Sequence, residues 1–571
     1  MNEFSPLQNQ RLSAGLPSWL FALGVSLLAS LAVLIPFFIL GSASGHDFEF
    51  HVASWLDVAY QWKHGVLYPQ WTAWTNYGFG EPRYIFYPPL SWMLGAALTF
   101  VLPISWVPGA FIFLTQTLAG VSAFLLLRRV SKPHAAYLGA AFYAANPYAL
   151  LVSYIRSDFA EQLGCAIFPL LLLAALRLSG LLQEEKPKSS AIVLFAVPFA
   201  AVWLSNAPAG VVASYSVALL FAWATLAQKS WQVATRAAAG LALGFGLTSF
   251  YLLPAAYEQR WVNIGQALSS GLLPAENFLF TRIADVEHTW FNWISSYCAL
   301  ALILLTALTA LFSRQFSASA NQSQVSRAAW NSLLLLGTAA LLLMLKFTLP
   351  LWNVLPKLRF VQFPWRWMSI LAVVSSCFLA AAMERRRGWL WFCLFVLISI
   401  PLGTFLTRNT WWDPDEMPTQ IAAITGGTGF EGVDEYDPLG DDHLDLPKNA
   451  PLAAVLSASA DNSDTPPPAA KIRIELWWPK EKHLRVETPG PARVALRLLN
   501  YPAWQVTVNG RSVITQRPDQ VDQMIVPIDK GQSEIRVHFT RTPDRTAGIA
   551  LSLASALVGI AWLGWRKSPG S

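Results

Sequence analysis

The stretch that decides the fold class is the first long apolar run, which reads WLFALGVSLLASLAVLIPFFIL over residues 19–40. An α-helix rises about 1.5 Å per residue, so about 20 apolar residues cross the hydrocarbon core of a membrane. The run is too long for the apolar part of a secretory signal peptide, and only Glu3 and Arg11 carry charge before it. We therefore expect residues 19–40 to form an uncleaved membrane anchor.

Apolar runs of this kind recur along the whole chain of 571 residues. Hydrophobic residues make up 54% of the chain and charged residues only 13%, whereas a soluble domain carries about 25% charged residues. This composition excludes an ordinary soluble enzyme. The sequence predicts a polytopic α-helical membrane protein with about twelve transmembrane helices, at residues 19–40, 108–127, 135–152, 162–179, 190–205, 208–227, 237–256, 293–312, 329–349, 367–383, 388–405 and 546–565.

Six basic clusters fall on alternate connections between these predicted helices. Clusters of Lys and Arg resist translocation, so the side that carries them is predicted to be the cytoplasm. They are Arg128-Arg129 with Lys132, Lys186 with Lys188, Lys229 with Arg236, Arg314 with Arg327, residues 385–387, and Arg566-Lys567. This pattern predicts a multi-pass protein of a bacterial inner (cytoplasmic) membrane with both termini in the cytoplasm. The formal charge of +6 lies in these loops, so we expect no nucleic-acid partner.

The opposite, periplasmic side receives three long segments, 41–107, 257–292 and 406–545. Within the first, residues 88–101 are apolar but too few to span the membrane, so we expect a helix on the membrane surface. The predicted organisation is a transmembrane core of residues 1–405, which includes the first periplasmic loop 41–107, and then a periplasmic domain of residues 406–545. A final transmembrane helix with a cytoplasmic tail occupies residues 546–571.

The predicted periplasmic domain changes character at Lys471. Residues 406–470 are expected to be irregular, and their acidic stretch, 413–445, holds ten carboxylates and no Lys or Arg. Its spacing matches no EF-hand loop, so we interpret it as a solvated acidic face. Over residues 471–545, short alternating stretches separated by Asn-Gly and Pro-Gly turns predict an antiparallel β-sandwich. All four cysteines lie in apolar runs, so we expect no disulfide in this domain.

The first periplasmic loop begins with an unusual group of polar residues, GHDFEFH at residues 45–51. Carboxylates beside a membrane lose hydration unless they are paired, bind a cation or exchange protons. Asp47 is therefore a candidate general base, with His46 and Glu49 beside it. The alternative is a solvated turn in which Asp47 caps an amphipathic helix over residues 50–62.

Two further connections carry charge on the predicted periplasmic side. The turn after the third helix contains Arg156, Asp158 and Glu161, whose acids could face Asp47 as a paired-carboxylate or metal site. The alternative there is an Arg156–Asp158 pair at a helix end. The segment 350–367 carries Lys357, Arg359, Gln362 and Arg366 on the predicted periplasmic side, where Lys and Arg are usually few. These residues could bind an anionic lipid phosphate, or they could only contact lipid headgroups.

Aromatic residues with Gly and Pro fill the rest of the first loop, including YPQW at 68–71 and FYPP at 86–89. They suggest either a surface on which sugar rings stack or an aromatic belt at the membrane interface. These motifs, the Asp after the first helix and FVQFPWR at 360–366 resemble the bacterial membrane family labelled 6-pyruvoyl-tetrahydropterin synthase-related. Residues 500–510 with the closing helix are similar to YfhO-type membrane proteins. Both groups resemble GT-C glycosyltransferases, which use sugars carried on polyprenyl phosphate.

The resemblance implies a role for each candidate residue. Asp47 would be the base that activates an acceptor hydroxyl for inverting attack on the anomeric carbon. Donor-phosphate binding would fall to Arg359, Gln362, Arg366 and Arg83, and acceptor or metal orientation to Glu49, His46, Asp158 and Glu161. No cofactor is expected to be required, although a divalent cation, Mg or Mn, is an option at Asp47, Glu49 and Asp158.

The function expected from the resemblance is transfer of a hexosyl or pentosyl group from a polyprenyl-phosphate donor to an envelope glycan, lipid or protein acceptor at the periplasmic face. The alternatives are a transporter or flippase of a lipid-linked saccharide and a non-catalytic envelope scaffold. Transporters place ionisable groups in mid-membrane, often on paired broken helices. The interiors of the predicted helices are almost free of charge, which favours the enzyme.

Overall fold

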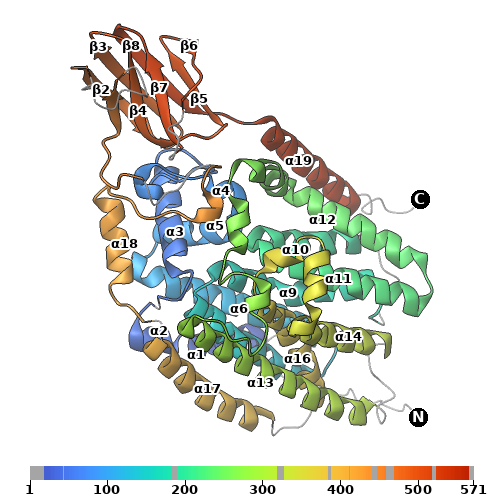
Figure 1. The fold of residues 1–571 in the computed structure, drawn as a ribbon. Helices are drawn as coiled ribbons and strands as arrows, with labels where there is room; N and C mark the ends of the chain where they lie inside the picture. Colours follow the sequence, from blue (N-terminus) through green and yellow to red (C-terminus); the bar gives the residue numbers. More distant parts are fainter. Residues whose placement is uncertain are drawn as a thin grey trace, which may run out of the picture.

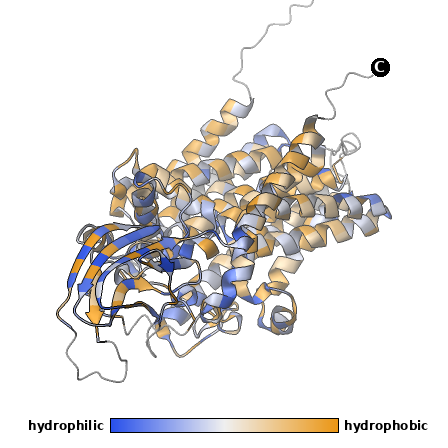
Figure 2. Ribbon diagram, turned by 90° about the horizontal axis from the view of Figure 1, so that it is seen from above, coloured by the Kyte–Doolittle hydropathy of each residue, from blue (hydrophilic) through white to orange (hydrophobic). Residues whose placement is uncertain are grey.

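The computed structural model describes residues 18–564, apart from residues 43, 183–189, 318–326, 384–387, 411, 440–445, 458–467 and 517–521. It consists of a bundle of helices with a β domain, residues 453–539, at one end (Figure 1). The helical part is predominantly hydrophobic, and hydrophilic residues gather on the β domain and the loops next to it (Figure 2). This distribution is the one that the composition predicted.

Helices occupy all twelve of the predicted transmembrane ranges and several connections between them. They are α1 (Ser18–Val33), α2 (Ile35–Leu40), α3 (Phe48–Lys63), α4 (Arg83–Phe86), α5 (Pro89–Thr99), α6 (Val107–Leu127), α7 (Pro133–Ala144), α8 (Pro147–Leu150), α9 (Phe159–Leu178), α10 (Ser190–Ser205), α11 (Ala207–Gln228), α12 (Trp231–Glu258), α13 (Val286–Ser317), α14 (Arg327–Leu343), α15 (Leu349–Val354), α16 (Met368–Ala382), α17 (Gly388–Thr410), α18 (Glu416–Thr425) and α19 (Pro543–Gly564).

Within the described residues, 8 helices are long and apolar enough to cross a membrane, or 9 if α14 and α15, bent by 91°, form one span. Three further apolar helices are shorter, Ser18–Val33, Ser190–Ser205 and Leu397–Leu406. The first of these is short because the run over residues 19–40 is divided into α1 and α2. Pro36 lies in the first turn of α2, where its missing N–H costs nothing, whereas inside a continuous helix it would remove a hydrogen bond. The count of twelve spans stays a prediction.

The apolar segment at residues 88–101 forms α5, whose 11 residues are too few to span a membrane. It packs against α3, and a Cβ added to Gly95 would collide with the ring of Trp55. Trp55 and Trp92 are fully buried between these elements. The first loop is therefore folded, as its aromatic content suggested, and its core is continuous with that of the helix bundle, because Trp55 stacks on Phe111 of α6.

The β domain contains β1 (Ala453–Leu456), β2 (Lys471–Trp478), β3 (Glu481–Thr488), β4 (Ala492–Leu499), β5 (Trp504–Val508), β6 (Arg511–Ser512), β7 (Gln523–Ile528) and β8 (Gly531–Phe539). One sheet has the order β1-β4-β7 and the other β2-β3-β8-β5-β6, and all strand pairs are antiparallel. Asn509 and Gly510 have positive φ between β5 and β6, as a tight hairpin requires. The predicted C-terminal β-sheet domain is confirmed.

The acidic stretch is more regular than expected, because α18 forms inside it and packs on α3. Its last residues, 441–445, lie outside the described residues. The basic residues Lys229 and Arg236 lie at the start of α12, whose other end contacts the β domain through Glu258. The clusters at residues 186 and 188, 385–387 and 566–567 lie outside the described residues, and so does the side chain of residue 314.

The helix α19 returns from the β domain along α12 (Figure 1). Ser552 Oγ accepts a hydrogen bond from Phe250 N at 2.8 Å and donates one to Gly246 O at 3.0 Å. Small residues permit this close approach of two helices. The β domain is thus joined directly to the helix bundle at its C-terminal end.

Candidate functional site

The loop that carries Asp47 is attached by backbone hydrogen bonds to the turn that carries Arg156. His46 N donates to Ile155 O at 3.3 Å, and Asp47 N donates to Arg156 O at 2.9 Å. A Cβ added to Gly45 would lie 2.6 Å from Ile155 O, so only glycine permits this approach. Two segments that are about 110 residues apart in sequence therefore form one surface.

The turn before α9 has an unusual backbone. Residues Leu151–Arg156 form a π-helical turn, η3, and Ser157 follows with φ +50°. Turns of this kind are rare and often lie at functional sites, because they change the direction in which the next side chains point. Asp158 then begins α9 and accepts a hydrogen bond from Glu161 N at 2.9 Å. The carboxyl of Asp158 thus stabilises the start of the helix.

Asp47 forms an ion pair with Arg156, in which Arg156 Nη2 lies 2.5 Å from Asp47 Oδ2. The same guanidinium donates from Nη1 to His46 Nδ1 at 3.1 Å, and since Arg only donates, the His46 ring is neutral. The Asp47 side chain makes no cap hydrogen bond to α3, so the alternative of a simple helix cap is wrong. The alternative of an Arg156–Asp158 pair is also not what forms, because the partner of Arg156 is Asp47.

Access to solvent separates Asp47 from the other acids of the site. Its side chain is 31% exposed, whereas the side chains of Asp158 and Glu161 are 2% and 3% exposed. Its carboxyl is nevertheless recessed among protein atoms, and this desolvation raises the pKa of Asp47 although Arg156 opposes the rise. Burial acts on Asp158 in the same sense, but Arg366 and the neighbouring His51 outweigh it and lower the pKa of Asp158. A proton at the site therefore binds to Asp47 before it binds to Asp158.

Arg366 lies in a deeper layer of the site. Its Nε lies 2.9 Å from Glu161 Oε2 and its Nη2 lies 3.1 Å from Asp158 Oδ2. The remaining Nη1 donates to Val361 O at 3.0 Å and to Gln362 Oε1 at 3.3 Å. Tyr148 donates its hydroxyl hydrogen to Glu161 Oε1 from the other side. Arg366 is thus surrounded by protein acceptors, which orient it and the two acids.

The motif FVQFPWR at residues 360–366 supplies the aromatic part of the site. The Phe363 ring centre lies 5.0 Å from the Arg156 guanidinium and 4.9 Å from that of Arg366, so both cations pack on one ring. Gln362 occupies a classic γ-turn, with φ +64° and a hydrogen bond from Phe363 N to Val361 O at 2.7 Å. Its amide donates to Ala267 O at 2.8 Å, which connects the motif to the segment before α13.

We refer to Asp47, Arg156, Asp158, Glu161 and Arg366 as the acid–arginine site. His46 and Gln362 adjoin it, because they accept hydrogen bonds from Arg156 and Arg366. The remaining predicted residues lie outside it. The side chain of Arg359 is exposed, and Glu49 accepts a hydrogen bond from Gln420 of α18. Arg83 is buried in a separate network, where its Nε lies 2.5 Å from Glu81 Oε1 and its Nη1 donates to Ser54 Oγ at 3.0 Å.

No group of three or more His, Cys, Asp or Glu side chains that could hold a metal ion occurs among the described residues. At the acid–arginine site, Arg156 and Arg366 occupy carboxylate oxygens that a divalent ion would need. The metal site considered at Asp47, Glu49 and Asp158 stays a prediction.

His51, the last residue of the GHDFEFH stretch, was predicted no role and lies one helical turn after Asp47. It is buried, and its Nε2 lies 3.7 Å from Asp158 Oδ1, beyond hydrogen-bond distance. Neither ring nitrogen has a hydrogen-bond partner among the described residues. The spacing of four residues from Asp47 on an amphipathic helix was the signal that could have identified it.

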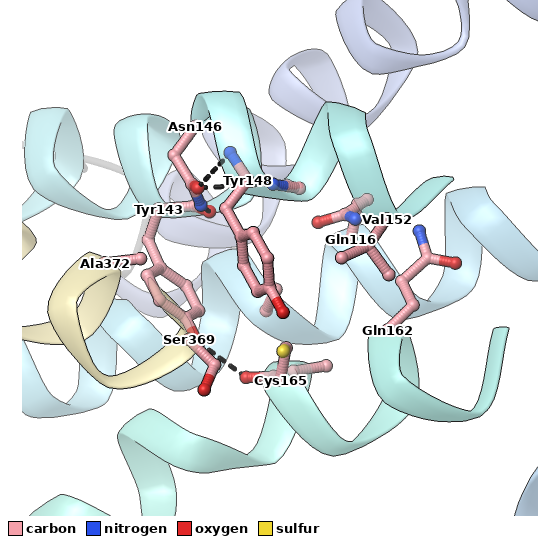
Figure 3. Close-up of a pocket in the computed structure, with 12 residues that line it drawn as sticks. Gln116, Tyr143, Asn146, Tyr148, Val152, Gln162, Cys165, Ser369 and Ala372 are labelled. Atoms are coloured by element: carbon pink, nitrogen blue, oxygen red, sulfur yellow. Dashed lines mark hydrogen bonds between the residues drawn. The ribbon is translucent and has the colours of Figure 1, made fainter. Parts of the chain in front are cut away.

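A cavity of about 20 Å³ lies behind Tyr148 (Figure 3). Asn146, Gln162 and Cys165 line it, and Tyr143 donates its hydroxyl hydrogen to Cys165 O at 2.6 Å. A cavity of this size holds about one water molecule. It is too small for a sugar.

Three solved structures are similar to parts of this chain. Arabinofuranosyltransferase AftD from Mycobacteria is 16% identical over 69% of this chain with a TM-score of 0.41, and archaeal oligosaccharyltransferase AglB from Archaeoglobus fulgidus is 14% identical over 72% with a TM-score of 0.38. This chain spans only 26% and 56% of the lengths of those two proteins. ArnT from Cupriavidus metallidurans bound to undecaprenyl phosphate is 13% identical over 82% of this chain and 97% of its own, with a TM-score of 0.32.

The first two of these proteins are named as an arabinofuranosyltransferase and an oligosaccharyltransferase. No curated protein sequence matches the chain. The family model "6-pyruvoyl-tetrahydropterin synthase related domain; membrane protein" matches residues 84–411, which is more than half of the chain. The match includes the turn before α9 and the FVQFPWR motif, but neither Asp47 nor the YfhO-like residues 500–510. The chain belongs to the 6-pyruvoyl-tetrahydropterin synthase related family of membrane proteins.

Proposed function

We propose that the protein is an inverting membrane glycosyltransferase that moves a hexosyl or pentosyl group from a polyprenyl-phosphate donor to an envelope acceptor. The observation that carries the proposal is the arrangement of the acid–arginine site. A solvent-accessible carboxylate, Asp47, is joined to a guanidinium, Arg156, above a buried layer of Asp158, Glu161 and Arg366. This arrangement offers one base and one phosphate ligand side by side.

In the proposed reaction, the acceptor hydroxyl oxygen attacks the anomeric carbon from the side opposite the phosphate. Its proton passes to Asp47, the new glycosidic bond forms, and the bond between the anomeric carbon and the phosphate oxygen breaks. The polyprenyl phosphate leaves with the electron pair of that bond. Asp47 is the base because it is the accessible acid of the three, and because its raised pKa makes it the better proton acceptor.

Arg156 is the residue that we assign to the leaving phosphate. Its Nε has no hydrogen-bond partner among the described residues, and Phe363 and Trp365 hold its guanidinium plane from the side. A planar fork of donors placed in this way stabilises the charge that develops on a phosphate oxygen. Arg366 makes four hydrogen bonds to protein acceptors, and two of them go to Asp158 and Glu161, so we assign it the positioning of these two acids. Arg359 remains a candidate for an outer phosphate contact.

The sidedness of the reaction follows from the basic clusters of the sequence. We propose that the β domain and the acid–arginine site face the periplasm of a bacterial inner membrane, and that both termini face the cytoplasm. Among the described segments, Lys229 and Arg236 at the far end of α12 support this orientation. The acceptor would then be an envelope glycan, lipid or protein.

The test is the substitution Asp47→Asn in purified, folded protein, assayed for sugar transfer from a radiolabelled polyprenyl-phosphate donor. The amide keeps the shape of the side chain and cannot take the proton, so we expect transfer to fall by at least about 10²-fold. The matched control is Glu287→Gln, which makes the same chemical change at an exposed acid near the start of α13. Full activity in Asp47→Asn would show that Asp47 is not the base.

A transporter or flippase is the second candidate, and the observation that favours it is the 91° bend between α14 and α15, a broken span. Transporters of this type use two such elements related by internal symmetry, and only one bent pair occurs among the described residues. Proteoliposomes separate the candidates. Donor-dependent label on an acceptor supports the enzyme, and movement of intact lipid-linked sugar across the membrane supports the flippase. If neither is observed, the non-catalytic scaffold is the candidate that remains.

A further inference from the structure

A second cavity, unconnected with the acid–arginine site, opens between the first loop and the β domain. Its volume is about 200 Å³. Five aromatic side chains from three separate segments line it, namely Tyr60 of α3, Trp71 and Trp74 of the first loop, and Trp477 and Trp478 at the end of β2. We call it the tryptophan cavity. The contact of the aromatic first loop with the β domain was not predicted from the sequence.

Polar groups lie among these rings. Lys482 on β3 is buried, donates to Trp478 O at 2.7 Å and to Pro479 O at 3.1 Å, and lies 4.5 Å from the ring centre of Trp504. Arg497 on β4 donates from Nε to Tyr77 O at 2.6 Å and from Nη2 to Thr428 O at 3.0 Å. A guanidinium carries five hydrogens, so Arg497 retains donors for a ligand. Burial lowers the pKa of Lys482 to about 7, and in its charged form this residue carries one hydrogen beyond the two that the carbonyls accept.

The chemistry of the lining selects among ligand classes. Another cavity, lined by Phe168, Leu172, Val217 and similar side chains inside the helix bundle, is apolar and measures about 30 Å³. An acyl chain suits walls of that kind, but in the tryptophan cavity it would leave buried donors without partners. A sugar ring presents an apolar C–H face and a rim of hydroxyls, and the tryptophan cavity presents flat aromatic faces together with N–H donors.

The cavity is held in shape before any ligand arrives. Arg497 connects β4 to the first loop, and a Cβ added to Gly78 would lie 2.8 Å from Arg497 Nε, so the contact requires glycine there. Tyr60 packs on Trp74 with ring centres 4.5 Å apart. Trp478 stands on β2, the edge strand of its sheet, and is 49% exposed. A rigid aromatic wall of this kind loses little conformational entropy when a ligand binds.

We infer that the tryptophan cavity is a binding site for a neutral saccharide, which stacks on Trp478 and Trp74 and accepts hydrogen bonds from Lys482 and Arg497. The inference does not rest on the proposed function, because saccharide binding at this site requires no transfer. In the proposed enzyme it would hold a glycan away from the reacting sugar.

The test uses the full-length protein in nanodiscs and saturation-transfer-difference NMR with three probes, chitotriose, maltotriose and mannotriose. We expect at least one probe to receive saturation at its ring C–H protons. Trp478→Ala should weaken its binding about tenfold, which corresponds to about 1.4 kcal/mol. Trp478 is the best position for this change because its exposed ring on an edge strand contributes little to the core.

The matched control is Trp231→Ala, which removes a tryptophan that is 82% exposed at the far end of α12. It should leave saccharide binding unchanged. Lys482→Met provides a second variant, in which the stem is retained and the donors are lost, and it should weaken the same probe. The inference is wrong if no probe binds, if Trp478→Ala and Lys482→Met both bind as the unmodified protein does, or if a tripeptide binds at the cavity in place of the saccharides.

Discussion

Arg545 of α19 forms a bidentate ion pair with Glu258 of α12, with Nε 2.6 Å from Oε1 and Nη2 2.7 Å from Oε2. Tyr501 of the β domain donates to the same carboxylate at 2.6 Å, and Arg545 Nη1 donates to Gln70 of the first loop at 3.1 Å. Both ionic side chains are almost completely buried. This one pair therefore joins the helix bundle, the first loop and the β domain.

Breaking this pair from one side should destabilise the protein. Glu258→Gln leaves the buried guanidinium of Arg545 without its counter-charge, so we expect the free energy of unfolding to fall by about 3–5 kcal/mol. The double substitution Glu258→Leu with Arg545→Met removes both charges and should cost less than the two single changes added together. Thermal unfolding in detergent measures this, and simple additivity would contradict an energetic coupling of the two residues.

The two arginines of the acid–arginine site should respond differently to lysine. Arg156→Lys retains a charge but loses the planar fork, so we expect sugar transfer to fall by about 10²–10³-fold with little change in unfolding temperature. Arg366→Lys cannot satisfy Asp158 and Glu161 together, so it should mainly lower the stability. Unchanged stability of Arg366→Lys with loss of transfer would instead make Arg366 the phosphate ligand.

Gly45→Ala should separate the Asp47 loop from the turn before α9. The added Cβ would lie 2.6 Å from both Ile155 O and Ser157 Oγ, so the loop has to move and Asp47 loses its place beside Arg156. We expect loss of transfer in a protein that still folds, as judged by circular dichroism. The control is Gly24→Ala in α1, where the added methyl meets no atom within 4 Å and should leave transfer unchanged.

Stability should depend on pH through Asp57 of α3. Burial raises the pKa of Asp57 to about 6, against hydrogen bonds from Ala73 N, Tyr84 and Gln61. Between about pH 4 and pH 6 Asp57 is protonated to a greater extent in the folded state than in the unfolded state, so its contribution to the free energy of unfolding falls as pH rises and is constant above that window. The expected change is about 3 kcal/mol.

Asp57→Asn should remove this slope, because an amide does not titrate in the window. The measurement is the unfolding temperature of both proteins from pH 4 to pH 7. Glu287→Gln, at an exposed position, should retain the slope of the unmodified protein. An identical slope in Asp57→Asn would assign the effect to another group.

Chelation should leave the proposed transfer unchanged. Arg156 and Arg366 already neutralise the acids of the site, and Glu49 is turned to Gln420 of α18. The assay is sugar transfer before and after dialysis against EDTA, with Mg²⁺ and Mn²⁺ added back. A loss that either ion restores would indicate a metal site that includes the substrate phosphate.

The helices were predictable because hydropathy is a local property, and each apolar run of about 20 residues is long enough to reveal itself. The division into α1 and α2 follows from Pro36. A count of apolar residues does not detect it, because Pro36 interrupts the helix without interrupting the apolar run. The helix α18 was missed because acids and turn-forming Gly and Pro surround it, and ten residues give little periodic signal.

The predicted membrane topology was enough to place Asp47, Asp158 and Arg366 at the same end of the bundle. It could not assign partners. Which arginine meets which acid depends on the π-helical turn at Leu151–Arg156, because one extra residue in a helical turn redirects the side chain of Arg156 toward Asp47. Partner choice between segments this far apart is a tertiary property that no local pattern contains.

The ion pair of Asp47 and Arg156 has a consequence for the order of events in the proposed reaction. At rest the candidate base and the candidate phosphate ligand satisfy each other. A donor phosphate that forms an ion pair with Arg156 must therefore displace Asp47. Only then is the Asp47 carboxylate free to take a proton. Until the donor has bound, Asp47 stays paired with Arg156 and is not available to take the proton of the acceptor hydroxyl. Such an enzyme would bind its substrates in a compulsory sequence, donor first.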